Sequence, residues 1–152
     1  MKLIDDLKKR GWKISTAESC TGGLLAKTIT DCAGSSEIFE FGAVVYSNKF
    51  KNKLLGVPNE VLTRYGAVSE QTAYALSKGI CDYSGSEVGV GITGLAGPGG
   101  ATKEKPVGLV YLSVYIKQED LNICEELLLS GNREQIRNQT VTAVIKKLES
   151  IL

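Results

Sequence analysis

The order of strand-like and helix-like segments constrains the fold of this chain more than any single residue does. Apolar runs typical of strands lie at 12–17, 43–46 and 87–93, and helical periodicity precedes, separates and follows them, at 2–10, 20–31, 48–56 and 69–83. Two further strand-like runs, 107–116 and 121–129, flank a polar turn, and Asn132 is placed to cap a final helix. This order predicts the α/β class: a single layered α/β/α domain over residues 1–152 with a mixed sheet.

Length and composition are those of an ordinary globular domain. The 152 residues are 43% hydrophobic and 23% charged, with a formal net charge of +1. This balance gives no electrostatic reason to expect a nucleic acid or membrane partner. The N-terminus lacks the apolar core of a signal peptide and no run is long enough to cross a membrane, so we expect a cytoplasmic protein. The four cysteines are widely spaced with no C-x-x-C pair, so we expect neither a disulfide framework nor a metal site.

The chain contains no histidine. Its absence excludes Ser-His-Asp and Cys-His catalysis, histidine-ligated zinc and imidazole proton transfer. Any nucleophile in this protein therefore needs a lysine, a tyrosine or a carboxylate as its base.

The turn after the first predicted strand carries two potential nucleophiles, Ser19 and Cys20, followed by Thr21, Gly22 and Gly23. In one interpretation Ser19 caps the next helix, which is the common role of a serine at this place. In the other, Ser19 is a nucleophile and the amides from Cys20 to Gly23 stabilise an oxyanion. Cys20 is the rival nucleophile, because thiolates favour helix N-termini. The residues alone leave these alternatives open.

A second glycine-rich segment follows the third strand and carries Gly94, Gly97, Gly99 and Gly100. Residues 89–94 match G-x-G-x-x-G, but their glycines lie within a strand and a proline interrupts the helix that a dinucleotide site requires. The segment is either a nest of amides that binds an anion or a flexible connection.

Basic residues cluster after the second strand, where Tyr46 is followed by Lys49, Lys51 and Lys53. A lysine can act as a base only if burial or nearby cations lower its pKa. The alternative is a solvated basic helix face, which is the more common role of such a run. Arg133 and Arg137 in the final helix have the same two interpretations, as phosphate ligands or as surface charge.

Six motifs, taken together, carry a resemblance to a known family. They are AESCTGG, GSSEIFEFGAVVYSN with Lys51 just beyond it, GAVSE, GITGLAGPGG, EKPVG and GNREQIR. The chain resembles the CinA C-terminal domain family, the nicotinamide mononucleotide amidohydrolases, from about residue 10 to its end. Larger members carry a molybdopterin-binding-like domain before this region, so the chain resembles the stand-alone form.

The resemblance implies metal-free and cofactor-free hydrolysis of the carboxamide of nicotinamide mononucleotide to nicotinic acid mononucleotide and ammonia. Ser19 corresponds to the nucleophile and Lys51 to its basic partner, while Tyr46, Thr93 and Arg133 match the remaining active-site positions. We expect Lys51 or Tyr46 to take the serine proton, the amides near Cys20 to Gly23 to hold the oxyanion with Thr93, and Arg133 with the glycine segment to hold the phosphate.

Three positions depart from the family pattern. Asn132 stands where an aspartate is usual, Ala101 replaces a glycine, and Val45 replaces a threonine. None is a proposed catalytic position, so we expect them to affect substrate affinity more than chemistry. The alternatives are a nucleotide-binding regulatory module with little turnover, or a Ser-Lys hydrolase of another amide. The S-x-x-K placement of penicillin-recognising enzymes is missing here. We expect the protein to form a homodimer or higher homo-oligomer.

Overall fold

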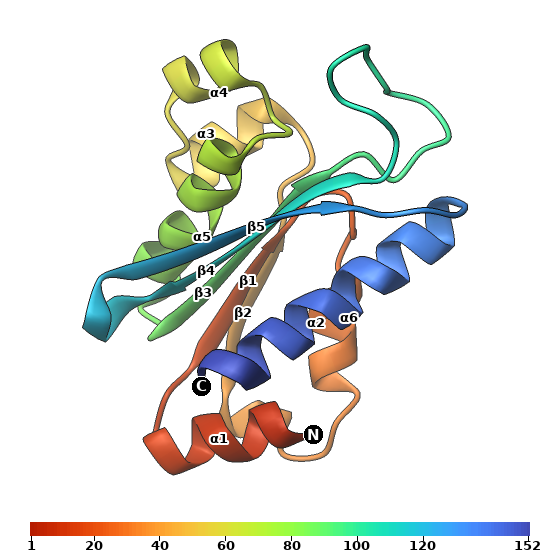
Figure 1. Cartoon of the computed structure of the whole chain (residues 1–152). Helices are drawn as coiled ribbons and strands as arrows, with labels where there is room; N and C mark the ends of the chain where they lie inside the picture. The colour runs from red at the N-terminus through yellow and green to blue at the C-terminus, as the bar shows by residue number, and fades with distance from the viewer.

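The computed structural model describes all residues 1–152, which form a five-stranded sheet covered by helices on both faces (Figure 1). This architecture confirms the predicted α/β fold with a mixed sheet. The helices are α1 (Lys2–Arg10), α2 (Leu24–Thr30), α3 (Asn48–Leu55), α4 (Asn59–Tyr65), α5 (Glu70–Ser84) and α6 (Arg133–Ile151). The strands are β1 (Ile14–Glu18), β2 (Phe39–Val44), β3 (Val88–Gly94), β4 (Leu109–Ile116) and β5 (Leu121–Leu128).

The strands follow one another across the sheet in the order β2-β1-β3-β4-β5. Strand β1 runs parallel to both β2 and β3, whereas β4 is antiparallel to β3 and β5. The carboxyl ends of β1, β2 and β3 therefore meet at one edge of the sheet, which is where ligands bind in open α/β folds. Ser19, Val45 and Thr93 all lie at this edge.

Helices α1, α2 and α6 cover one face of the sheet, and α3, α4 and α5 cover the other (Figure 1). Each face has its own cluster of buried apolar side chains. The first includes Leu7, Leu25 and Val144, and the second includes Leu55, Leu62 and Ile80. All five residues of β1 are buried, as expected for a strand covered on both sides. No helix has both the length and the apolar character that a membrane span requires.

Most of the predicted elements are confirmed, including two helix caps. Ser69 accepts a hydrogen bond from the Thr72 amide at the start of α5. Asn132 and Gln135 form a reciprocal capping box at the start of α6. The predicted hairpin is also present, with a short 3-10 turn between β4 and β5.

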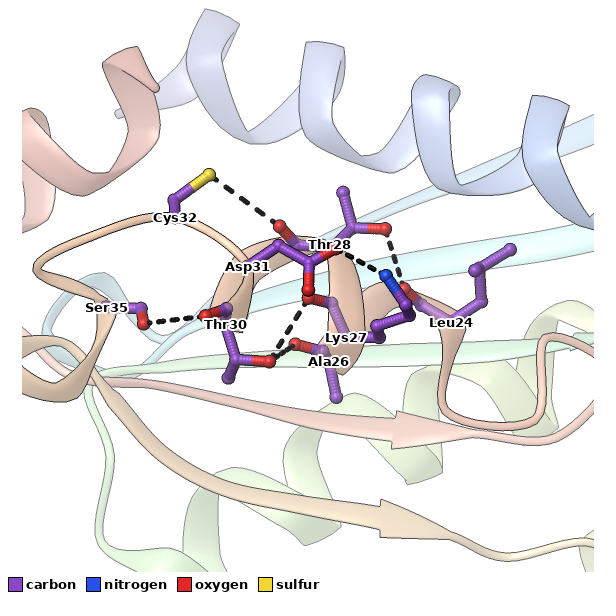
Figure 2. A network of polar contacts seen from close by, with 8 residues as sticks. All are labelled: Leu24, Ala26, Lys27, Thr28, Thr30, Asp31, Cys32 and Ser35. Carbon is purple, nitrogen blue, oxygen red and sulfur yellow. Dashed lines mark hydrogen bonds and ion pairs between the residues drawn. The ribbon is translucent and has the colours of Figure 1, made fainter.

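The start of α2 differs from the sequence prediction. The helix was expected from residue 20 but begins at Leu24, because Gly22 and Gly23 adopt left-handed conformations with φ of 60° and 98°. The residue at the N-cap is Gly23, so the interpretation of Ser19 as a helix cap is wrong. Figure 2 shows the rest of this short helix, where the Thr28 and Thr30 hydroxyls donate to carbonyls one turn earlier. The second strand also differs, since it spans 39–44 instead of 43–46.

Two glycines in β3 allow α5 to lie close to the sheet. A Cβ at Gly91 would lie 2.5 Å from the Ala73 carbonyl oxygen and 2.6 Å from the Ser77 amide nitrogen, both in α5. Gly89 meets the Ser77 carbonyl in the same way. The alternation of glycine with valine and isoleucine in β3 therefore reflects a close helix–strand contact.

We expect Gly91→Ala to destabilise the protein by about 3 kcal/mol, because the backbone of α5 or of β3 would have to move to make room for the added Cβ. Chemical denaturation monitored by circular dichroism measures this change. Gly99→Ala is the matched control, because a Cβ at that exposed position meets no atom within 4 Å. An equal stability for the two variants would contradict the close contact between α5 and β3.

Candidate active site

Ser19 and Lys51 lie together at the carboxyl edge of the parallel strands. Ser19 directly follows β1, and its backbone amide donates to the Ile92 carbonyl in β3 at 3.1 Å. Lys51 comes from α3, which begins where the Ser47 side chain accepts a hydrogen bond from the Phe50 amide. Its Nζ lies 3.0 Å from Ser19 Oγ. Two segments separated by more than 30 residues therefore form one buried pair.

The Lys51 side chain is 1% exposed and has no carboxylate partner. Besides Ser19 Oγ, its Nζ contacts the carbonyl oxygens of Val45 at 2.9 Å and Tyr46 at 2.8 Å. A neutral amine has two N–H bonds and one lone pair. If the N–H bonds serve the two carbonyls, the lone pair faces Ser19 and can accept its proton.

Burial lowers the pKa of the Lys51 ammonium from 10.5 to about 8. The cause is desolvation, which disfavours the charged form of a lysine. The neutral amine is therefore accessible near physiological pH. Of the three lysines in this helix, Lys51 alone is buried, whereas Lys49 is exposed as a solvated face would be.

Cys20 lies beside this pair but in a poor environment for a nucleophile. Its side chain is 6% exposed, and burial raises the pKa of its thiol to about 11. The neutral thiol is therefore the dominant form, and it is much less nucleophilic than a thiolate. All four cysteines are free, and no three His, Cys, Asp or Glu side chains are grouped to hold a metal ion.

Glu18 is a site residue that the sequence analysis did not identify. Its buried carboxylate accepts hydrogen bonds from the amides of Gly23, Leu25 and Ala26, at 2.8 to 3.1 Å. These groups lie at the N-terminus of α2, where the helix dipole also favours a negative charge. Glu18 thus fixes the turn that carries Ser19. The sequence signal for this role is a carboxylate a few residues before a helix whose N-cap is a glycine without a capping side chain.

Some backbone amides of the turn between β1 and α2 donate hydrogen bonds within the protein, and others have no acceptor in another residue. Gly22 donates to the Ser19 carbonyl and Gly23 to Glu18, so neither amide is free to bind a ligand. The amides of Cys20 and Thr21 donate to no other residue. The Thr21 side chain is fully buried, so only its backbone can serve a ligand.

Thr93 and Tyr46 lie near the pair, with their hydroxyl groups engaged elsewhere. The Thr93 hydroxyl is buried and donates to the Ala67 carbonyl at 2.7 Å, which ties β3 to the segment after α4. Tyr46 is 61% exposed, and its hydroxyl accepts from Arg133 Nη2 at 3.1 Å. The Tyr46 backbone carbonyl, not its phenol, contacts Lys51. The geometry thus brings the lysine amine to Ser19.

Arg133 links Tyr46 to the glycine segment, because its Nη1 donates to the Gly97 carbonyl at 2.6 Å. Gly94 belongs to β3 and pairs with Val110 of β4. Gly99 and Gly100 are exposed. The segment between β3 and β4 projects from the sheet edge as a long loop (Figure 1). The amides of Gly97, Gly99 and Gly100 donate to no acceptor in the protein.

The chain is similar to known proteins in both sequence and fold. A family model described as the CinA C-terminal domain matches residues 1–152. The chain belongs to the CinA C-terminal domain family. A putative competence-damage inducible protein of Desulforudis audaxviator is 49% identical over 152 residues, which are 99% of this chain and 36% of that protein. A CinA-like protein of Kosmotoga olearia is 49% identical over 137 residues, which are 90% of this chain and 33% of that protein.

The CinA-family chain thus spans about a third of the length of these curated relatives. Solved structures resemble it over most of their length. The competence/damage inducible protein CihA of Agrobacterium tumefaciens has a TM-score of 0.95 at 41% identity, covering 98% of this chain and 90% of that one. The competence damage-inducible protein A of Klebsiella pneumoniae has a TM-score of 0.95 at 29% identity, covering 99% and 92%. The predicted resemblance to the CinA family is confirmed.

We expect Glu18→Gln to destabilise the CinA domain by about 1–3 kcal/mol, because an amide replaces one acceptor oxygen with a donor facing buried N–H groups. Urea denaturation measures the loss. Glu40→Gln removes the same charge from an exposed position in β2 and serves as the control. If both variants unfold at the wild-type urea concentration, Glu18 does not hold the turn.

Proposed function

We propose that this CinA-family domain is an amidohydrolase that converts nicotinamide mononucleotide to nicotinic acid mononucleotide and ammonia. The observation that carries the proposal is the buried Lys51 amine, 3.0 Å from Ser19 Oγ and with two carbonyls as its other partners. A chain without histidine needs such a base if a serine is to act as nucleophile. The substrate is the one that the CinA resemblance implies.

In the first step, Ser19 Oγ attacks the carboxamide carbon while neutral Lys51 accepts the hydroxyl proton. The carbonyl π electrons move to oxygen, and a tetrahedral intermediate forms with one negative charge. The free amides of Cys20 and Thr21 are the donors we assign to this oxyanion. The Thr93 hydroxyl, which donates to Ala67, supports the shape of the site.

In the second step, the Lys51 ammonium returns the proton to the departing nitrogen. The carbon–nitrogen bond breaks, ammonia leaves, and the substrate acyl group remains bound to Ser19 as an ester. Water then attacks this ester with Lys51 again accepting a proton, which it passes to the Ser19 oxygen as the acid leaves. Each cycle consumes one water molecule and restores both groups.

The remaining predicted positions surround this pair. The exposed ring of Tyr46 offers an aromatic face to the cationic pyridinium of the substrate. Arg133 connects this ring to the glycine segment through one hydrogen bond to each. The free amides of Gly97, Gly99 and Gly100 supply further donors for the ribose or the phosphate.

We expect the purified protein to release ammonia from nicotinamide mononucleotide and Ser19→Ala to reduce the rate at least about 1,000-fold, since the nucleophile is lost. Coupled measurement of ammonia gives the rates. Cys20→Ala is the matched control and should keep most of the activity, because its thiol is protonated. If the wild type binds the nucleotide without releasing ammonia, the regulatory-module alternative replaces the amidohydrolase.

The pH profile tests the role of Lys51. Below its pKa of about 8 the ammonium cannot accept a proton, so we expect kcat/KM to rise about tenfold from pH 7 to pH 9. Lys51→Met should reduce the rate by about 100-fold to 10,000-fold and abolish this rise. Lys49→Met, on the exposed face of the same helix, should keep the wild-type profile. A profile unchanged in Lys51→Met would assign the base to another group.

A further inference from the structure

A hollow of about 460 Å³ lies between α2 and the start of α6. It is lined by Leu24, Arg133, Glu134, Arg137 and Asn138, and we call it the arginine hollow. Neither arginine forms an ion pair with a carboxylate. A larger hollow of about 660 Å³ on the opposite face, between α4 and α5, is lined by none of the proposed site residues. The arginine hollow therefore combines a cavity with unneutralised positive charge.

Arg137 has the hydrogen-bonding capacity that a ligand would use. Its only hydrogen bond runs from Nη2 to the Thr21 carbonyl at 2.8 Å. Its Nε is buried and has no acceptor. A buried guanidinium N–H without an acceptor is costly, and such groups in native proteins usually serve a ligand or ordered water. Arg133 differs, because the Gly97 carbonyl and the Tyr46 hydroxyl already engage it.

The position in α6 adds to the positive potential. Arg133 and Arg137 are four residues apart, so their side chains leave the same face of the helix. The Asn132 cap accepts from the Gln135 and Ile136 amides, which leaves the Arg133 and Glu134 amides without acceptors. The first turn of a 19-residue helix also carries the positive end of its dipole.

The arginine hollow adjoins the Ser19–Lys51 pair through two contacts. Arg137 holds the carbonyl of Thr21, two residues after Ser19. Arg133 holds the hydroxyl of Tyr46, whose backbone carbonyl contacts Lys51. The two guanidinium groups are therefore hydrogen-bonded to the segments that carry Ser19 and Lys51.

We propose that the arginine hollow binds the phosphomonoester of the substrate and that Arg137 is its principal ligand. This inference rests on the proposed function, which it deepens by assigning the phosphate to Arg137 in preference to the glycine segment. A planar guanidinium with free N–H groups matches phosphate oxygens in charge and geometry. The consequence is selection of a nucleotide over the corresponding nucleoside.

The negative charge of Glu134 opposes binding of an anion in the arginine hollow. Its carboxylate lines the same hollow and is exposed, without an ion-pair partner. It repels an anion bound there, so removing its charge should strengthen phosphate binding. A hollow that only recognised uncharged polar groups would not respond in this way.

The test is calorimetric titration of the Ser19→Ala protein, which keeps the substrate intact, with nicotinamide mononucleotide, nicotinamide riboside and inorganic phosphate. We expect Arg137→Gln to weaken binding of the mononucleotide 10-fold to 100-fold and to leave the riboside within twofold. Glu134→Gln should strengthen binding of the mononucleotide and of phosphate. Arg64→Gln, which removes an exposed arginine from α4, is the control and should change neither.

The outcomes separate this proposal from the proposed function. Equal weakening of mononucleotide and riboside by Arg137→Gln, or no weakening of either, would overturn the assignment of Arg137 to phosphate. If the wild type binds the mononucleotide through Arg137 but releases no ammonia, the hollow stands and the amidohydrolase proposal fails. If neither the mononucleotide nor phosphate binds while Arg137 is intact, the hollow is not a phosphate site.

Discussion

The contact of the Glu18 carboxylate with the amides of α2 determines how the rest of the site is built. It supplies the acceptors that the helix start lacks, since Gly23 at the N-cap has no side chain to offer. A carboxylate in this place compensates the positive end of the helix from within the protein. The helix start is therefore not available to a substrate anion, and negative groups of a ligand must find other donors.

Lys51 illustrates the opposite use of a buried ionisable group. Glu18 accepts hydrogen bonds from three backbone amides, whereas Lys51 has no carboxylate partner and contacts only neutral groups. Burial without a counter-charge disfavours the ammonium and lowers its pKa, which makes the neutral amine accessible. The same sheet edge thus holds one buried carboxylate with three amide donors and one buried amine with only neutral partners.

The sequence predicted the element order, the Ser69 and Asn132 caps and the mixed sheet, because these depend on local periodicity and on short-range hydrogen bonds. The resemblance to the CinA family supplied the pairing of Ser19 with Lys51, which no local pattern contains. The start of α2 was predicted four residues too early, because the helical periodicity extends across Gly22 and Gly23, whose left-handed conformations delay the helix to Leu24. The free N–H groups of Arg137 and the cap made by Glu18 depend on tertiary neighbours, so residue patterns alone could not reveal them.

The parallel arrangement of β1, β2 and β3 has a consequence for how the candidate site forms during folding. Parallel neighbours cannot be joined by a tight turn, so each pairing requires closure of a long connection. Ser19 and Lys51 meet only after such a closure, and Arg133 and Arg137 arrive from the last helix of the chain. Fragments with native local structure therefore lack the complete site, which forms only when the long-range topology is complete.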